Sequence, residues 1–341
     1  MPKLPYLVSL LLLAPLTLGA AQTTADRGPH GDPNLLPAGC SSCHVGHGVK
    51  GAPMLPVDEV DLCLACHGSR PSALAMQRQG KLALNVFPDD LEAVFKKLSS
   101  HPIWDRGKHS PSEGLYPKGE RHAECADCHE HHRVTAYKQS GASAMKRSPL
   151  LAFTFEYDLC YRCHGAQAGA SKDISALFNT GNRSYHPVEG RAKGTGRGLL
   201  PPWAADSVMA CTDCHGNNDP NGPKGPHGSD FAPILIKRYD TSDGQESPDR
   251  YALCYSCHDR NQLYTTSDFG GHGRHVQQAG LACADCHSAH GSVNNRALIQ
   301  FAGPNVLPSK SGRLEYDSNA PGTGQCYVNC HGVEHNPLSY P

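Results

Sequence analysis

The chain has 341 residues, among them 16 cysteines, 21 histidines, 35 glycines and 27 prolines. Apolar residues make up only 38% and charged residues 18%, which is too little apolar material for a large core packed from side chains alone. The 31 basic and 32 acidic side chains nearly cancel, so the chain has no basic footprint for nucleic acid.

The first 21 residues have the pattern of a secretory signal peptide. Lys3 is the only charge ahead of an apolar run over residues 7–18, and Gly19, Ala20 and Ala21 offer a small-residue cleavage site. The alternative is an uncleaved membrane anchor, but a helix that spans a bilayer needs about 20 apolar residues and this run is shorter. We therefore expect an exported protein that works in the periplasm, at the cell surface or outside the cell.

All 16 cysteines follow one pattern. The sequence C-x-x-C-H occurs seven times, and the eighth pair, Cys326 and Cys330, has one additional residue between its cysteines. Two thiols at this spacing reach the two vinyl groups of one haem, and the histidine that follows is then held under the iron. Zinc sites and redox C-x-x-C motifs do not require a histidine directly after the second cysteine. The spacing also overrules the disulfides expected of an exported protein.

The pattern thus predicts eight covalently attached haem c groups. The predicted attachment cysteines are Cys40, Cys43, Cys63, Cys66, Cys125, Cys128, Cys160, Cys163, Cys211, Cys214, Cys254, Cys257, Cys283, Cys286, Cys326 and Cys330. The predicted proximal iron ligands are His44, His67, His129, His164, His215, His258, His287 and His331.

The motifs alternate between two classes, so the repeating unit is a pair of haem sites. First-class motifs are followed by a second histidine, as in CADCHSAHG from Cys283, whereas second-class motifs resemble DLCLACH around Cys63. In the first-class motif at Cys211 a loop delays that second histidine. The order repeats four times, which is an internal repeat. It predicts a signal peptide over 1–21 and four dihaem modules over 22–85, 86–172, 173–262 and 263–341.

The spacers between the motifs repeat as well. The segment over 91–103 resembles that over 174–188, and each contains a His-Pro pair. In the first spacer four apolar residues follow Asp89 and Asp90 at helical spacing, which predicts a short helix with its apolar face on a haem. These four are Leu91, Val94, Phe95 and Leu98. The segments over 191–203 and 217–228 are rich in Gly, Pro and Asn and are predicted loops. No segment alternates convincingly as a strand.

The supply of histidine indicates bis-histidine coordination. Thirteen histidines remain after the eight proximal ones, and none of the five methionines recurs at a matching position. One predicted distal set follows the first-class motifs and is expected to ligate neighbouring haems: His47, His132, His227 and His290. The second set lies upstream of the motifs: His30, His101, His186 and His275. His272 competes with His275, while His335, His109 and His122 are weaker candidates. His131 is better explained as a solvated side chain or a hydrogen-bond partner of a ligand.

The alternating motif pairs, the CHSAHGS and GPHGSDFAPIL segments and the stretch over 251–340 resemble the multihaem c-type cytochromes with doubled C-x-x-C-H motifs of metal-respiring anaerobic bacteria. The resemblance implies a haem-templated fold, mostly coil with few short α-helices and little or no β-sheet. It also implies a continuous chain of haems with alternating stacked and perpendicular contacts. Here the Cys211 loop and the first module, which lacks a His-Pro spacer, depart from the pattern.

Two classes of function follow. The first is an electron conduit without catalytic residues, which takes electrons from a quinol-oxidising complex or another cytochrome and passes them to an extracellular acceptor. Such a conduit could act alone, in an outer-membrane complex or as a homopolymeric filament. The second is a reductase of nitrogen or sulfur oxyanions with one haem open for substrate. We favour the conduit because the surplus of histidine makes an open iron position unnecessary.

Overall fold

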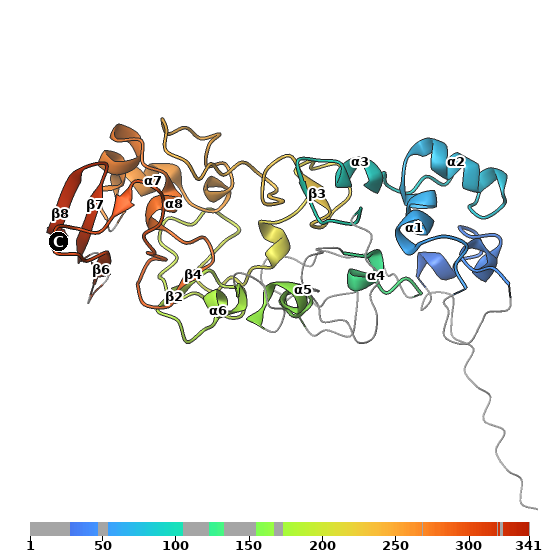
Figure 1. Ribbon diagram of the computed structural model, residues 1–341, viewed down its shortest axis with the longest axis horizontal. Helices are drawn as coiled ribbons and strands as arrows, with labels where there is room; N and C mark the ends of the chain where they lie inside the picture. Colours follow the sequence, from blue (N-terminus) through green and yellow to red (C-terminus); the bar gives the residue numbers. More distant parts are fainter. Residues whose placement is uncertain are drawn as a thin grey trace, which may run out of the picture.

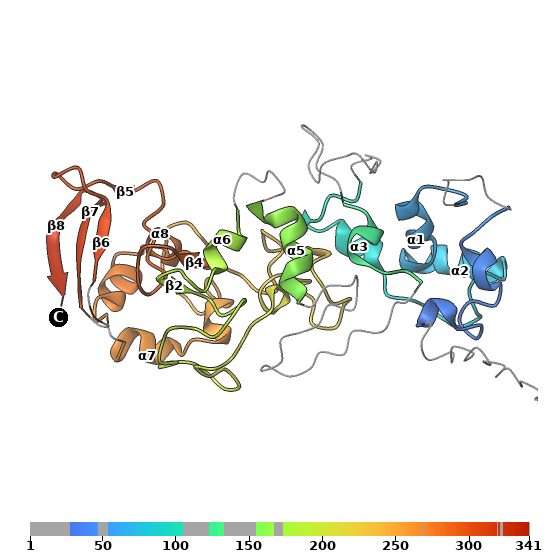
Figure 2. The same ribbon diagram turned by 90° about the horizontal axis from the view of Figure 1, so that it is seen from below.

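The computed structural model describes residues 28–46, 54–104, 123–132, 155–166, 173–267, 269–318, 320 and 323–340. The predicted signal peptide and the candidate ligands His47, His109 and His122 lie outside these described residues. The molecule is elongated, and its elements follow the long axis in approximate sequence order (Figures 1 and 2). Helices α1 (Glu59–His67) and α2 (Arg70–Arg78) lie at one end. Strands β7 (Gly324–Cys330) and β8 (Val333–Tyr340) lie at the other.

Helical structure is short and coincides with the cysteine motifs. Helices α1 and α5 (Glu156–His164) each begin four residues before the first cysteine and end at the following histidine. Five further motifs form a single turn: η3 (Gly39–Ser42), α4 (Cys125–Cys128), η5 (Cys211–Asp213), η6 (Cys254–Ser256) and α8 (Cys283–Cys286). In these turns the histidine N–H donates to the carbonyl of the first cysteine, for example His129 to Cys125 at 2.8 Å. The C-x-x-C-H spacing therefore places both thiols and the imidazole on one compact turn.

The predicted spacer helix is present but ends early. Helix α3 (Leu91–Phe95) starts where the Asp90 side chain accepts a hydrogen bond from Ala93 N at 3.0 Å. Val94 and Phe95 are buried, whereas Leu98 lies beyond the helix and is 80% exposed. Its repeat is the four-residue helix α6 (Ser175–Phe178). Other helical segments are α7 (Arg260–Thr265), the π-helical η7 (Gly273–Gln278) and η2 (Pro29–Gly31).

Two short antiparallel ladders join segments that lie more than 100 residues apart. Strand β1 (Ser99–Ser100) pairs with β3 (Gly228–Ser229), and β2 (Ser184–Tyr185) pairs with β4 (Gly291–Ser292). In each ladder one strand directly precedes a His-Pro pair. The other strand is the Gly-Ser of a His-Gly-Ser sequence. The two ladders are therefore copies of one structural unit.

The C-terminal region forms a four-stranded antiparallel sheet, so the expectation that no segment forms a strand is wrong there. Strand β7 pairs with β8 along most of its length and with the short strands β5 (Val306–Leu307) and β6 (Glu315–Asp317) on its other side. The additional residue in Cys-Tyr-Val-Asn-Cys lengthens the spacing of the regular motif, and Tyr and Val favour extended backbone. Gly332, with φ of 81°, lies in the turn that leads into β8.

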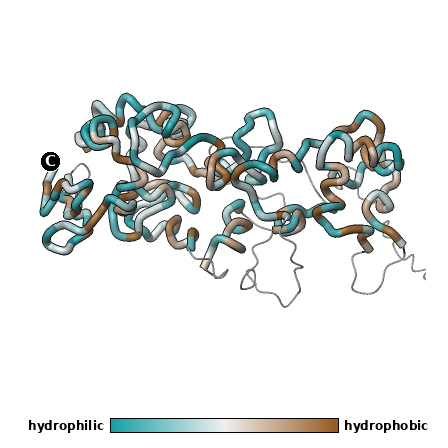
Figure 3. The backbone as a smooth tube through the Cα atoms, turned by 45° about the horizontal axis from the view of Figure 1, so that its top comes forward, coloured by the Kyte–Doolittle hydropathy of each residue, from teal (hydrophilic) through white to brown (hydrophobic). Residues whose placement is uncertain are grey.

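Side-chain packing near the end formed by α1 and α2 consists of two small clusters. One cluster contains Leu36, Ala73, Met76 and Leu82, and another contains Leu64, Phe95 and Ile103. Hydrophobic stretches of the backbone are spread along the whole length (Figure 3).

A continuous cavity of about 4370 Å³ is lined by residues from Pro29 to Tyr340. This volume is several times that of an ordinary small-molecule site, which is about 300–1,000 Å³. Among the described residues, no helix has the length and apolar character needed to cross a membrane.

Candidate haem-binding sites

Eight pairs of histidine rings face one another along the cavity. Seven pairs join a histidine that directly follows a cysteine motif to one from another segment: His44 with His132, His67 with His30, His129 with His227, His164 with His101, His215 with His290, His258 with His186, and His287 with His272. The eighth pair joins His275 and His335. In all eight the ring centroids are 6.0 to 6.4 Å apart.

This separation fits one metal ion between two imidazoles. With metal–nitrogen bonds of about 2.0 Å on opposite sides of the metal, the two ring centroids lie about 6.3 Å apart. Direct ring stacking would bring them closer, as His131 and His132 show at 4.5 Å. The histidine pairs therefore have the geometry of axial ligand pairs.

The hydrogen bonds of these rings select the tautomer that binds a metal. Nδ1 of His101 donates to Pro226 O at 2.6 Å, and Nδ1 of His287 donates to Ala297 O at 2.8 Å. The same bond from Nδ1 to a backbone carbonyl is made by His30, His186, His215 and His275. Because a carbonyl only accepts, the hydrogen lies on Nδ1, and the lone pair of Nε2 is left for a metal.

Burial keeps many of these imidazoles neutral. Desolvation, together with a smaller effect of neighbouring histidines, lowers the pKa of each of four histidines to about 4: His67, His227, His258 and His272. Neutral imidazole is the form that coordinates a metal. The sites thus hold their candidate ligands ready to bind at neutral pH.

The two ladders position distal histidines in pairs. Next to the β1–β3 ladder, His101 N donates to His227 O at 3.2 Å, and next to the β2–β4 ladder, His186 N donates to His290 O at 3.0 Å. The ring edge of Phe95 in α3 contacts His227, with centroids 5.4 Å apart. The loop-delayed His227 therefore occupies the same structural position as His290.

The structure places most predicted ligands beside a histidine of another motif. His132, His227 and His290 each lie beside the proximal histidine of the preceding first-class motif, as expected of ligands to a neighbouring haem. The upstream His30, His101 and His186 lie beside second-class proximal histidines: His67, His164 and His258.

The last two pairs differ from the sequence-based interpretation. His272, which the sequence left as a competitor of His275, lies beside His287, and His275 lies beside His335. His331, predicted from its place after Cys330, instead has Nε2 at 3.0 Å from Asp243 Oδ2. The sequence offered a signal for His272 in its spacing of three residues from His275, but none that placed His335 above His331.

Cysteines of successive motifs lie next to one another in an alternating pattern. In the first, third and fourth predicted modules the second cysteines influence each other: after burial, the thiols that most raise the pKa of Cys66, Cys214 and Cys286 are those of Cys43, Cys257 and Cys330. In the second module the thiols of both Cys160 and Cys163 raise the pKa of Cys128, and Cys160 has the larger effect. Between modules the first cysteines meet instead: Cys63 with Cys125, Cys160 with Cys211 and Cys254 with Cys283. The attachment sites therefore follow one another in sequence order.

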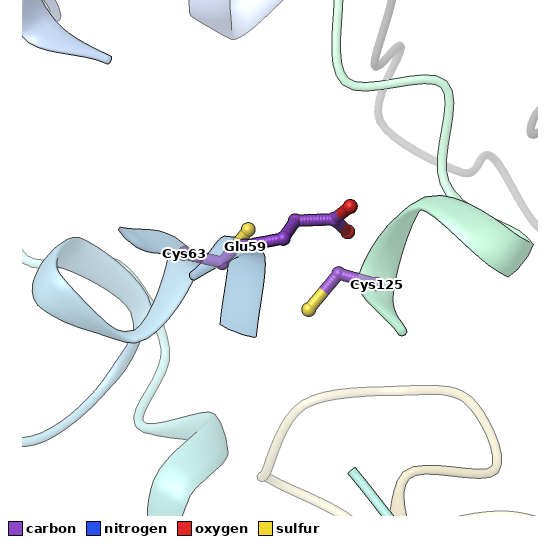
Figure 4. A group of neighbouring side chains, drawn as sticks. All are labelled: Glu59, Cys63 and Cys125. Atoms are coloured by element: carbon purple, nitrogen blue, oxygen red, sulfur yellow. The ribbon is translucent and has the colours of Figure 1, made fainter. Parts of the chain in front are cut away.

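A zinc or disulfide interpretation does not fit this arrangement. In the structure no disulfide joins any of the 16 cysteines. Among the described residues, one cluster brings three possible metal ligands within 4.8 Å of one another: Glu59, Cys63 and Cys125. In Figure 4 these side chains face each other across the junction of α1 and α4, and the two cysteines belong to different motifs.

Glu59 has a structural role that the sequence analysis missed. Its Oε1 accepts a hydrogen bond at 2.6 Å from Ala126 N, in the next motif. Glu156, at the same position four residues before a second-class cysteine, accepts from Thr212 N at 2.9 Å and from Thr212 Oγ1 at 3.0 Å. The repeated glutamate in EVDLC and EYDLC was the available signal for these junctions.

Comparison with known proteins agrees with this chemistry. Residues 35–71 match the family described as the doubled CXXCH motif, and residues 211–301 match the family described as cytochrome c-type protein NrfB-like. The chain is a multihaem c-type cytochrome. This cytochrome is 23% identical over 371 residues to the multiheme cytochrome MtrA of Shewanella baltica (strain OS185). The alignment covers 94% of this chain and 85% of that protein. No solved structure matches the cytochrome.

The residues present fit haem c as the cofactor. The cysteine motifs offer thiols for covalent attachment, and the histidine pairs would supply axial ligands, six of which have the required tautomer. If the cavity were shared by one group for each of the eight cysteine pairs, each would have about 550 Å³, within the range of about 300–1,000 Å³ for a small-molecule site. Haem binding thus accounts for the cysteines, the histidines and the cavity together.

Proposed function

We propose that this cytochrome is an electron conduit that holds eight haem c groups in a row, in sequence order. The observation that carries this proposal is the set of eight histidine pairs along one continuous cavity. When bound, each haem supplies an iron that changes its charge by one electron. The chain fixes the spacing, ligation and burial of these irons.

Two histidines at each iron would leave no position for a substrate. In six of the paired histidines, His101, His215 and His287 among them, Nδ1–H donates to a backbone carbonyl, which orients the ring and increases the basicity of Nε2. A stronger nitrogen ligand on both sides suits a centre that changes oxidation state without changing its ligands. These features favour electron transfer over catalysis.

The alternating cysteine contacts support continuity along the row. Sites of adjacent modules approach each other through first cysteines, for example Cys63 and Cys125, whose thiols are hydrogen-bonded. At each of the seven junctions between successive motifs a thiol of one motif raises the pKa of a thiol of the next. An electron that enters at one end would then meet no interruption along the chain.

The predicted modules also interlock. In the first three, the first site takes its distal histidine from the following module, as His132 does for the site of His44. In the last predicted module His272, from within that module, takes this place beside His287. Each junction is thus held by an axial ligand as well as by the chain.

The cellular setting is part of the proposal. The predicted signal peptide and the similarity to multiheme cytochrome MtrA support an exported protein in the periplasm or at the cell surface. Its partners would be other redox proteins, with a quinol-oxidising complex or a cytochrome as donor and a cytochrome or extracellular acceptor beyond it. A homopolymeric filament would use the same end-to-end geometry.

Electron paramagnetic resonance of the oxidised, fully matured protein tests this proposal against the reductase alternative, which the match to the NrfB-like family leaves open. A conduit with eight histidine pairs gives only low-spin ferric signals and binds neither carbon monoxide when reduced nor nitrite when oxidised. A high-spin signal that shifts when nitrite is added would establish an open haem and favour a reductase.

A further inference from the structure

We propose that His335, rather than His331, is the second axial ligand of the haem attached to Cys326 and Cys330, opposite His275. This assignment rests on the proposed function, since it presupposes that the irregular cysteine pair carries a haem. It departs from the general rule that the histidine directly after the second cysteine binds the iron.

The first argument is the placement of the two imidazoles relative to the cavity. His335 lines the cavity, together with all fifteen other histidines of the eight pairs, whereas His331 does not. His335 is 9% exposed, and its ring centroid is 6.2 Å from that of His275, within the range of the other seven pairs. The His331 side chain is 42% exposed.

The second argument is the register of the hairpin. Along β7, residues 328 and 330 lie two positions apart and point to the same face of the sheet, while the register with β8 shifts between Cys326 and Val328. His335 in β8 lies directly opposite Val328, and directly opposed residues share a face. Cys326, Val328, Cys330 and His335 all line the cavity, so both thiols and this imidazole face the same volume.

The third argument is that His331 has another partner. It lies in the turn between β7 and β8 with φ of 51°, and its backbone N–H donates to Asn305 O at 3.2 Å. In the one-turn motifs the corresponding N–H donates to the first cysteine of the same motif, which closes the turn under the iron. The Nε2 of His331 is 3.0 Å from Asp243 Oδ2, and that oxygen also accepts from Asn305 Nδ2 at 3.1 Å. His331 thus ties the turn to another segment of the protein.

The opposite ligand is well fixed. Nδ1 of His275 donates to Gly271 O at 2.8 Å within the segment that leads into η7, which leaves Nε2 for the metal. His272, three residues earlier, lies beside His287. The two histidines of this segment therefore serve the last two sites, and the last one needs an imidazole from the hairpin.

Methionine substitution distinguishes the two candidates, because methionine can still bind iron and raises the potential of its haem. We expect His335→Met to retain eight haems, to gain the far-red absorption band of a methionine–iron bond, and to have one haem that titrates at a higher potential. The matched control His331→Met should gain neither feature. As a second variant, His335→Gly should give one high-spin haem in eight that binds carbon monoxide and returns to low spin when imidazole is added.

A far-red methionine–iron absorption band in the His331→Met variant would overturn the assignment of His335 as the ligand. An unchanged low-spin spectrum in both His335 variants would also overturn it, whatever happens to the His331 variant. The haem count and spectrum of the unsubstituted protein separate this failure from failure of the conduit. Fewer than eight haems, or a high-spin signal before any substitution, would contradict the proposed function itself.

Discussion

At the scale of single residues, Glu246 shows how a charge is held in a protein with little side-chain core. Its side chain is 3% exposed and accepts hydrogen bonds from Arg260 Nη2 at 2.5 Å, Arg260 Nε at 2.9 Å and the Tyr255 hydroxyl at 2.9 Å. The hydrogen bonds from Arg260 lower the pKa of Glu246, and burial opposes this only in part. The carboxylate is therefore charged and paired at neutral pH.

We expect Glu246→Gln to lower the free energy of unfolding by about 2 to 3 kcal/mol, because it leaves Arg260 without its counter-charge. The matched control is Glu315→Gln, whose partner Arg313 is also an arginine at 2.5 Å but whose carboxylate is 54% exposed. An exposed pair contributes less than about 1 kcal/mol. Guanidinium unfolding, followed by circular dichroism of the haem band, measures both variants. Equal unfolding midpoints for the two variants would show that the buried ion pair contributes no more stability than the exposed one.

Among individual ligands, the sequence predicts proximal histidines better than distal ones. The place of a proximal histidine is set by a local turn of five residues, so the motif alone predicts candidates such as His129 and His287. Distal partners depend on contacts between distant segments, such as His101 N to His227 O across 126 positions, and no local pattern reports them. Counting histidines established that enough ligands exist, but only the fold decides which rings meet.

At the scale of elements, the two ladders are the units that assemble distal ligands. A Cβ atom at Gly291 in β4 would overlap the carbonyl oxygen of Leu177 at the end of α6. A Cβ atom at Gly228 in β3 would meet Val94 O at the corresponding place near α3. Glycine is therefore required wherever a ladder strand passes a spacer helix.

We expect Gly291→Ala to shift β4 and move His290 away from His215. One haem in eight should then gain high-spin character and bind carbon monoxide after reduction. The control is Gly194→Ala, since a Cβ at Gly194 has no neighbour within 4 Å and the variant should match the unsubstituted spectrum. A fully low-spin Gly291→Ala protein would mean that the ladder does not position the ligand.

The spacer helix and the C-terminal hairpin show which elements a local sequence pattern can predict. The spacer helix was predicted correctly in place, because Asp90 and the apolar spacing are local signals, but Leu98 was wrongly included. The hairpin over residues 324–340 was missed because the inserted residue was interpreted only as an irregularity of the haem-attachment motif. Its strands are stabilised by pairing with each other and with β5 and β6, which a local pattern does not report.

At the scale of the whole molecule, the cavity takes the place that a hydrophobic core has in other proteins. Its lining runs from Pro29 to Tyr340, while the side-chain clusters beside it are small. A large apolar macrocycle at each cysteine pair would bury this lining and supply the missing apolar contacts. The composition already indicated such an organiser, because cysteine and histidine are abundant where aliphatic residues are scarce.

We propose that every cysteine pair, the irregular Cys326 and Cys330 included, carries one haem by thioether bonds. Intact mass measurement of the matured protein under denaturing conditions tests it most directly, because thioether-bound haem survives unfolding whereas zinc and non-covalent haem are lost. The expected intact mass is that of the mature polypeptide plus eight haems. A smaller number of haems, or the loss of two hydrogens per cysteine pair that marks disulfides, would contradict it.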